Sequence, residues 1–153
     1  MIKETNDAQL ITTLLHESFA QYEADPIPSS ALKETPQSIE QLLRTGTKAY
    51  IYFVDELPVA MVRTTIEDQA LLFSRLGVLP SYRQRGIARS LIAFVEEKAR
   101  EMNLPYVRCG VQKKERDNIA LYQRLGYSII DEQVSPRHKE PLIIVTMEKK
   151  LAD

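Results

Sequence analysis

Three segments rich in β-branched and aromatic residues follow one another with only short polar turns between them, and this pattern limits the fold more than any other feature. The segments are AYIYFV (49–54), VAMVRTTI (59–66) and ALLFSRLGV (70–78), and the turns are DELP and EDQ. Connections this short join neighbouring antiparallel strands, because a parallel partner needs a long crossover. The sequence therefore predicts an antiparallel meander over residues 49–78.

Before the meander, the sequence predicts a short strand around residue 2 and two helices. Asp7 can cap the first helix, whose apolar residues up to Phe19 recur every three or four positions and form one face. The second helix is expected to begin at Thr35 and the proline that follows it, and to end at Gly46. Segment 23–36, EADPIPSSALKETP, contains three prolines and is expected to be a loop.

After the meander, residues 82–102 are predicted to form a long amphipathic helix with Glu96 on its polar face. The rest of the chain predicts a strand in NLPYVRCGV, a short helix NIALYQRL capped by Asp117, and two strands, YSIIDEQV and PLIIVTMEKKL. This order predicts a mixed α/β or α+β fold with one central, mostly antiparallel sheet and helices on both faces. We expect a single domain over residues 1–153.

Composition and charge exclude several classes of protein. The formal net charge of −1 and the pI near 6.2 argue against a dedicated nucleic-acid binder. Cys109 is the only cysteine, so no intramolecular disulfide can form, and no Cys/His cluster has zinc spacing. No apolar run approaches a membrane span and no signal peptide is evident. We expect a cytoplasmic protein without a metal, acting on neither membranes nor nucleic acids.

The segment RQRGIARSLIAF (83–94) places several arginines and a glycine where the long helix begins. The first N–H groups of a helix lack internal acceptors, and the helix dipole makes that end partly positive. Gly86 leaves room for an anion, and Arg83, Arg85 and Arg89 add charged donors, so the segment predicts a diphosphate site. The alternative is that Gly86 is a tolerated helix glycine and the arginines form a solvated face.

Two motifs in this chain resemble the signatures of the GNAT superfamily of N-acetyltransferases. Residues 83–88, RQRGIA, fit the family pattern [RQ]-x-x-G-x-[GA], and Val78, followed by Leu-Pro, fits the pattern just before it. Further on, NIALYQRLGY resembles the second signature, with Tyr122, Gly126 and Tyr127 in the matching places. The resemblance covers essentially the whole chain and implies the GNAT-like acyl-CoA N-acyltransferase fold.

The resemblance implies an enzyme that transfers an acetyl group from acetyl-CoA, as co-substrate, to a primary amine of a small molecule or protein. The pantetheine arm would pair with a strand edge near residues 76–78, where the family has a bulge that Gly77 would ease, and a backbone N–H there would face the thioester oxygen. Glu115 stands where the family often has asparagine. The residues implied to bind the cofactor are Leu76, Gly77, Val78, Arg83, Gln84, Arg85, Gly86, Ile87, Ala88, Arg89 and Asn118.

Tyr122 is the candidate catalytic residue that the resemblance implies. A tyrosine with an unperturbed pKa of about 10 is protonated at neutral pH and can donate a proton to the leaving thiolate. The alternative is a core aromatic residue whose hydroxyl is hydrogen-bonded inside the protein. No general base is assigned: Glu67 and Asp68 are candidates, but they also fit a solvated turn, and a water chain can serve instead.

Other residues leave further alternatives open. Cys109 is expected to be a buried, inert thiol, and His138 to lie in an exposed loop. Arg63 and Arg75 could recognise a substrate carboxylate or face water. Residues 22–25, with Tyr22, Glu23 and Asp25, could select a cationic amine by analogy with the family.

Two other functions compete with the enzyme. One is a non-catalytic module that binds or senses acyl-CoA, suggested by Glu115 and the missing base. The other is a phosphate-binding regulator that uses RNA or a nucleotide, and the acidic pI argues against it. The resemblance also allows a homodimer, because dimers are common in the family.

Overall fold

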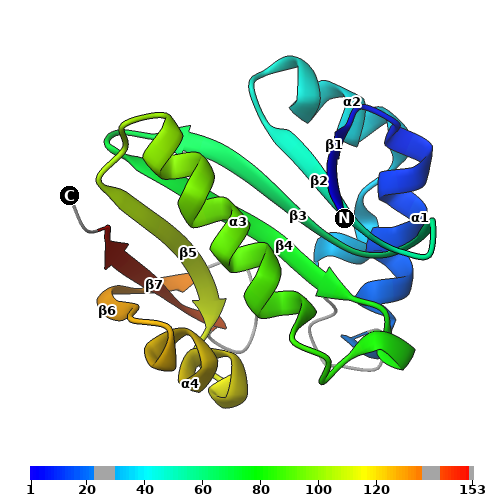
Figure 1. Cartoon of the computed structure of the whole chain (residues 1–153). Helices are drawn as coiled ribbons and strands as arrows, with labels where there is room; N and C mark the ends of the chain where they lie inside the picture. The colour runs from blue at the N-terminus through cyan, green and yellow to red at the C-terminus, as the bar shows by residue number, and fades with distance from the viewer. Residues whose placement is uncertain (23–29, 136–141, 152–153) are drawn as a thin grey trace. The chain divides into compact units, whose positions relative to one another are not determined.

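The computed structural model describes residues 1–22, 30–135 and 142–151, which form both strands and helices (Figure 1). The seven strands form one sheet in the order β1-β2-β3-β4-β5-β7-β6. The elements are β1 (Ile2–Thr5), α1 (Ala8–Ser18), η1 (Ala20–Tyr22), η2 (Ser30–Lys33), α2 (Pro36–Arg44), β2 (Lys48–Val54), β3 (Leu57–Glu67), β4 (Ala70–Val78), η3 (Pro80–Tyr82), α3 (Ile87–Glu101), β5 (Tyr106–Gln112), α4 (Arg116–Arg124), β6 (Ser128–Ser135) and β7 (Leu142–Lys150), where η marks a 3₁₀ helix.

The chain divides into two compact units, each of which is described by itself. The first unit contains Met1–Ile66 and Phe73–Val95, and the second contains Glu67–Leu72 and Glu96–Asp153. Within the described residues, no helix is long and apolar enough to cross a membrane.

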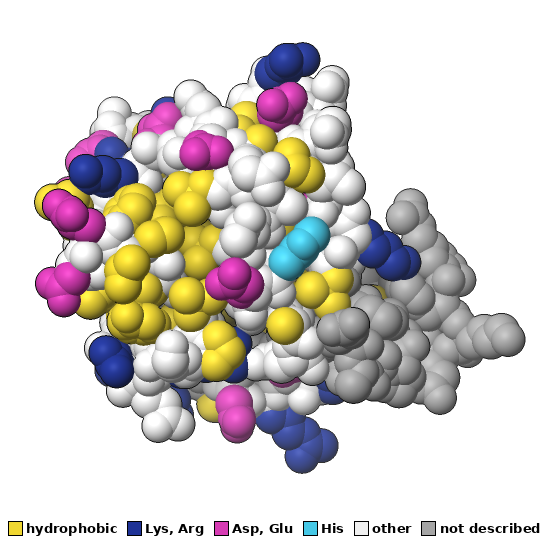
Figure 2. All heavy atoms as spheres, turned by 90° about the vertical axis from the view of Figure 1, so that its right-hand side faces the viewer, with side chains coloured by type: hydrophobic (Ala, Val, Ile, Leu, Met, Phe, Trp, Pro, Cys, Tyr) yellow, Lys and Arg dark blue, Asp and Glu magenta, His cyan; other side chains and the backbone are white. Residues whose placement is uncertain are grey.

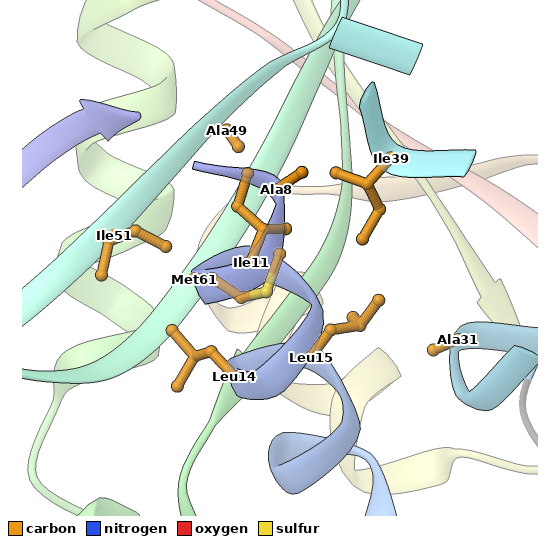
Figure 3. Packing of buried hydrophobic residues seen from close by; sticks show 9 residues of the cluster. All are labelled: Ala8, Ile11, Leu14, Leu15, Ala31, Ile39, Ala49, Ile51 and Met61. Atoms are coloured by element: carbon orange, nitrogen blue, oxygen red, sulfur yellow. The ribbon is translucent and has the colours of Figure 1, made fainter. Parts of the chain in front are cut away.

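In the first unit, α1 and α2 pack on one face of the β2–β3 pair, because their apolar residues recur at helical spacing. Asp7 caps α1, as predicted: its carboxylate accepts a hydrogen bond from Leu10 N at 3.1 Å. Figure 3 shows how the side chains of the helices and strands converge. The cluster consists of Ala8, Ile11, Leu14, Leu15, Ala31, Ile39, Ala49, Ile51 and Met61.

The opposite face of β2 is covered by α3. Tyr50 lies between Ala49 and Ile51 in the strand, so its side chain points to the other side of the sheet. Its ring meets Phe94 of α3 edge-on, with 4.9 Å between ring centroids. The predicted fold class, a mixed α/β sheet with helices on both faces, is therefore confirmed.

The second unit is built on the antiparallel strands β5, β7 and β6. Cys109 of β5 stands opposite Met147 of β7, and both side chains are buried. The register of β6 against β7 shifts between Ile129 and Asp131, which marks a bulge. Buried residues alternate along β5 and β7, and so one face of these two strands forms the core of the unit.

Hydrophobic side chains also reach the surface. Figure 2 views the molecule from the side on which α1 and α2 lie in Figure 1, and it shows one region of hydrophobic side chains with charged side chains at its edges. The largest exposed hydrophobic residues of the first unit are Met1, Leu57 and Ile66. Single exposed apolar residues are normal on soluble proteins and carry no functional conclusion by themselves.

Three local predictions were wrong. The long helix begins at Ile87 and not at residue 82, because Gln84 (φ 62°) and Gly86 (φ 79°) have left-handed backbones that a helix cannot contain. Asp117 does not cap α4, since Glu115 occupies the capping position. The predicted loop 23–36 contains the 3₁₀ helix η2 and the first residue of α2, whereas residues 23–29 lie outside the described residues.

The backbone irregularity expected near Gly77 lies two residues earlier. Arg75 has φ 53°, a left-handed conformation inside strand β4, as bulged strands have. Gly77 is needed for a different reason: a Cβ there would come within 2.8 Å of Ser18 Cβ and 2.9 Å of Phe19 Cε2. The end of α1 therefore packs directly on the backbone of β4.

We predict that Gly77→Ala lowers the free energy of unfolding by about 1–3 kcal/mol, because the added methyl group overpacks the contact with α1. Urea denaturation followed by circular dichroism measures this change. Gly110→Ala is the matched control, since its Cβ would meet Ile144 at an ordinary 3.5 Å. Equal stability of the wild type and the Gly77 variant would contradict this account of the packing.

Candidate functional site

The segment between β4 and α3 forms a turn whose backbone N–H groups are available to an anion. Gln84 and Gly86 are both left-handed and flank Arg85, and alternation of this kind turns successive N–H groups toward one side. Gln84 to Gly86 are all exposed. A Cβ on Gly86 would meet no atom within 4 Å, so the backbone conformation and not packing is what requires glycine there.

The start of α3 adds further free donors to this turn. The first helical hydrogen bond of α3 runs from Ser90 N to Gly86 O at 3.0 Å. The N–H groups of Ile87, Ala88 and Arg89 therefore have no acceptor within the helix. No carboxylate occurs in the sequence between Asp68 and Glu96 to compete for them. The turn and the helix start together offer an electropositive set of backbone N–H groups that suits a phosphate group.

The three arginines of this segment have different roles. Arg83 connects the end of β4 to α1 and η1 within the first unit. Its Nε donates to Val78 O and its Nη2 to Ser18 O, both at 3.0 Å, and its Nη1 donates to the side-chain oxygen of Gln21. Arg85 is exposed and stacks over the Tyr82 ring at 4.9 Å. Arg89 is exposed on the first turn of α3. Arg85 and Arg89 thus provide the accessible positive charge.

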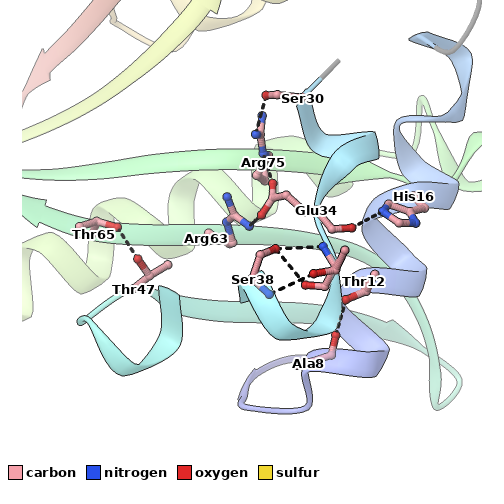
Figure 4. A network of polar contacts seen from close by, with 11 residues as sticks. Ala8, Thr12, His16, Ser30, Glu34, Ser38, Thr47, Arg63, Thr65 and Arg75 are labelled. Atoms are coloured by element: carbon pink, nitrogen blue, oxygen red, sulfur yellow. Dashed lines mark hydrogen bonds and ion pairs between the residues drawn. The ribbon is translucent and has the colours of Figure 1, made fainter. Parts of the chain in front are cut away.

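A polar network connects β3, β4 and the segment before α2, and Figure 4 shows Glu34 at its centre. Arg63 Nη1 donates to Glu34 Oε1 at 2.5 Å, and Arg75 Nε donates to Glu34 Oε2 at 2.8 Å. Arg75 Nη2 also donates to Ser30 Oγ at 2.8 Å. The main-chain oxygen of Glu34 contacts His16 Nε2 at 2.8 Å. The sequence left two alternatives for Arg63 and Arg75, recognition of a substrate carboxylate or exposure to water. Neither describes this contact, because both arginines bind a carboxylate of the chain itself.

The charges around Glu34 determine its protonation. Burial by itself would raise the pKa of the Glu34 carboxyl, since a charged group loses hydration. The hydrogen bonds and positive charges of Arg63 and Arg75 outweigh burial, and the net effect is a lowered pKa. Glu34 is therefore ionised at neutral pH.

In the second unit, α4 carries the candidate proton donor. Tyr122 is buried, 8% exposed, and its ring lies 6.2 Å from that of Tyr127. Asn118 and Glu115 are half-buried in and before the first turn of the same helix. Gly126 ends this segment with a left-handed backbone (φ 99°), and Tyr127 N then donates to Tyr122 O at 3.0 Å.

Glu96 is buried, which corrects its predicted place on the polar face of the long helix. It is 7% exposed, accepts a hydrogen bond from Tyr127 Oη at 2.9 Å and pairs with Lys149 Nζ at 3.0 Å. Burial and the nearby Glu96 carboxylate raise the pKa of Tyr127 far above its ordinary value, so its hydroxyl remains a donor. This network connects α3 and β7 to the residue that follows α4.

The remaining candidates fall in three environments. Cys109 is 2% exposed, and burial raises the pKa of its thiol to about 12, which confirms the predicted inert thiol. Glu67 and Asp68 are both exposed where β3 turns into β4, as the solvated-turn alternative expects. His138, Glu23 and Asp25 lie outside the described residues, and the side chain of Tyr22 is not described either.

The first unit therefore brings together the predicted residues of the β4 end and the helix start, namely Leu76, Gly77, Val78, Arg83, Gln84, Arg85, Gly86, Ile87, Ala88 and Arg89. Asn118 and Tyr122 share one helix of the second unit. Their assignment as cofactor-binding and catalytic residues stays a prediction.

Comparison with known protein families decides the identity of this arrangement. The sequence model of the Acetyltransferase (GNAT) family matches residues 11–127 of the chain. The chain belongs to the GNAT family. It is accordingly an acetyl-CoA-dependent N-acetyltransferase, and the family-level expectations of fold and activity are confirmed. No curated protein sequence matches the chain.

Solved structures share the fold of this GNAT protein at low sequence identity. A ribosomal-protein-alanine N-acetyltransferase from Brucella melitensis is 21% identical, with a TM-score of 0.78 and 99% of each chain covered. The PaiA N-acetyltransferase from Thermoplasma acidophilum, in complex with coenzyme A, is 16% identical, with a TM-score of 0.76 and 99% of each chain covered. A spermidine N-acetyltransferase chimera from Vibrio cholerae is 14% identical, with a TM-score of 0.77 and coverage of 98% of this chain and 94% of the other.

The sequence did not predict three features of this GNAT protein: the contacts of Glu34, the burial of Glu96 and the backbone of Arg75. Glu34 lies in a polar, proline-containing stretch, and its partners are 29 and 41 residues away. No local sequence pattern therefore predicts its pairing with them. Glu96 follows helical spacing onto the charged face of α3, and only packing against Tyr127 and Lys149 makes it a buried anion. The left-handed backbone at Arg75 has no sequence signal, because arginine rarely adopts it.

We predict that Glu34→Gln lowers the free energy of unfolding at pH 7 by about 1.5–3 kcal/mol, because two charged hydrogen bonds are lost. The lowered pKa makes this stabilisation complete above the unfolded-state pKa of about 4.3, and it disappears as pH falls through the lower folded-state value. Urea unfolding at several pH values should therefore show the gap to wild type closing below about pH 4.

The control for this measurement is Glu40→Gln, on an exposed position of α2. Its stability should stay within about 0.5 kcal/mol of wild type at every pH. A gap for Glu34→Gln that is constant from pH 7 to pH 3 would show that the carboxylate charge does not contribute.

Proposed function

We propose that the chain transfers an acetyl group from acetyl-CoA to a primary amine of a small molecule or protein by direct attack, with Tyr122 as general acid. The observation that carries the proposal is the backbone surface formed by Gln84, Gly86 and the first turn of α3. Its free N–H groups and left-handed glycine fit the diphosphate of the co-substrate. Bound acetyl-CoA supplies the acetyl group as an activated thioester.

Each part of the chain has a stated task in this proposal. The N–H groups of residues 84–89 bind phosphate oxygens, and the exposed Arg85 and Arg89 add positive charge. Residues 76–78, at the end of β4, pair with the amides of the pantetheine arm and offer one N–H to the thioester oxygen. Asn118 makes a further polar contact with the co-substrate. Arg83 holds the end of β4 in position by its hydrogen bonds to Val78 O and Ser18 O, since its guanidinium is already engaged.

Tyr122 holds a proton at Oη that the departing thiolate needs. Its burial on α4 and the ring contact with Tyr127 fix its side chain, as proton transfer by a positioned group requires. The buried position also fits the core-aromatic alternative, and kinetics of a variant separate the two. The proposal also includes a single catalytic domain over residues 1–153, a cytoplasmic location and a homodimer.

We predict that Tyr122→Phe lowers kcat by about 10²–10⁴-fold while the affinity for coenzyme A stays unchanged, because only the transferable proton is removed. Thiol release from acetyl-CoA with an amine panel measures kcat, and calorimetry measures affinity for coenzyme A. Tyr106→Phe, at a half-buried tyrosine of β5, is the control and should keep full activity.

The two outcomes for Tyr122 discriminate the enzyme from a binding module. If coenzyme A binds but no amine accelerates thiol release over the protein-free rate, the non-catalytic module is the better description. If turnover of Tyr122→Phe equals that of wild type, Tyr122 is a core aromatic residue and another group donates the proton.

Two glycines allow a matched test of the phosphate site. Gly86 and Gly46 are both left-handed, with φ 79° and 103°, and a Cβ on either meets no atom within 4 Å. We predict that Gly86→Val and Gly46→Val each lose about 1–2 kcal/mol of stability from backbone strain. Only Gly86→Val should lose affinity for coenzyme A, by about tenfold or more, since its side chain blocks the N–H groups. Equal affinities of the two variants would place the diphosphate elsewhere.

A further inference from the structure

The network around Glu34 holds more positive than negative charge. Two guanidinium groups, from Arg63 of β3 and Arg75 of β4, share the single carboxylate of Glu34. Arginine cannot be deprotonated in proteins, and the pKa of Glu34 is lowered, so the cluster carries one net positive charge at neutral pH. Among the described residues, Glu34 is the only carboxylate paired with these arginines, so a ligand or solvent must balance the remaining charge.

The cluster also has unused hydrogen-bond donors. Arg63 is 7% exposed, and its Nε is buried with no acceptor in the described part of the chain. Among the described residues, the two side chains donate hydrogen bonds through Arg63 Nη1 and through Arg75 Nε and Nη2. Arg63 Nη2 and Arg75 Nη1 have no acceptor there. The Arg75 side chain is 25% exposed, so part of the cluster is accessible from outside.

The position of Arg75 connects this charge to the proposed reaction. Arg75 directly precedes residues 76–78 of β4, which the proposed function assigns to the thioester end of the co-substrate. Its left-handed backbone is strained, by about 1–2 kcal/mol for a non-glycine residue. Figure 4 shows its side chain extending between Glu34 and Ser30. Strained residues of this kind persist where the surrounding structure holds them, often at functional sites.

Resting on the proposed function, we infer that Arg75, supported by Arg63, binds a carboxylate of the acceptor. The preferred substrate is then an amine that also carries an acidic group, as an amino acid does. A carboxylate suits the donors that remain, because Arg75 Nη1 and Arg63 Nη2 can each donate to one of its oxygens. Glu34 holds both guanidinium groups in place and limits the net charge to one. Arg75 is thus a specificity-determining residue, and a simple polyamine would be a poor acceptor.

A purely structural role of the cluster makes a different prediction. If Glu34, Arg63 and Arg75 only attach the segment before α2 to the sheet, loss of Arg75 would lower stability and affect all acceptors equally. A binding role changes the ratio between acceptors that differ only in their carboxylate. The experiment therefore compares L-amino acids with their carboxamides, pair by pair, in the acetyl-CoA thiol-release assay.

The expected result for wild type is a kcat/KM about tenfold or more higher for the acid than for its amide in the best pair, mainly through KM. Arg75→Gln should remove this preference, and Arg75→Lys should restore part of it, since lysine keeps the charge and loses the planar guanidinium donors. Arg44→Gln, at an exposed position of α2, is the matched control and should leave the preference unchanged. All assays are run below the melting temperature of each variant.

A second measurement does not depend on turnover. N-acetyl amino acids, the expected products, should raise the Tm of wild type and of Arg44→Gln, but not that of Arg75→Gln, and their carboxamides should raise none of the three. Two results would overturn the inference and leave the proposed acetyl transfer intact. In one, wild type acetylates acids and amides equally well; in the other, Arg75→Gln has the same ratio of kcat/KM between acid and amide as wild type. No thermal shift with any acid, together with no acetylation of either class, would also overturn it. Failure to bind coenzyme A would instead count against the proposed function.

Discussion

The left-handed backbone at Gln84 and Gly86 is the constraint on which the proposed co-substrate site depends. These two residues stop the helical pattern from extending back to residue 82 and make α3 begin at Ile87. A helix that began earlier would use the same N–H groups for its own hydrogen bonds. Gln84 adopts this conformation at a strain of about 1–2 kcal/mol, which the surrounding contacts must offset. The hydrogen bonds from Arg83 to Val78 O and Ser18 O are among those contacts.

Buried charge in this protein is arranged around carboxylates that hold two partners each. Glu34 binds two arginines in the first unit, and Glu96 binds Tyr127 and Lys149 in the second. In both cases the carboxylate loses hydration, and the hydrogen bonds that replace it decide whether the group remains charged. The two clusters differ in net charge, because Glu96 has one cationic partner whereas Glu34 has two. The excess positive charge around Glu34 is the basis of the proposed contact with an acidic acceptor.

Much of the fold follows from local sequence rules, as particular residues show. Asp7 and Thr35 cap their helices because short polar side chains reach the free N–H groups two or three residues on, and this needs no tertiary information. The alternation of Ala49, Tyr50 and Ile51 assigns each side chain to a face of the sheet in the same way. The RQRGIA motif likewise located the candidate co-substrate segment. Its individual arginines could not be ranked, because two of the three acceptors of Arg83 come from α1 and η1, more than 60 residues earlier.

The sequence by itself determined the order and type of the main helices and strands, the caps of α1 and α2, and the family, since these depend on neighbours within a few residues or on a short motif. Only the tertiary structure decided that Glu34 joins Arg63 to Arg75, that Glu96 is buried, and that Gly77 is required by the approach of α1. The physical reason is that burial and pairing of charges arise between segments far apart in the chain. A polar residue has the same local pattern whether it faces water or a partner, and its environment is fixed only when the chain has folded.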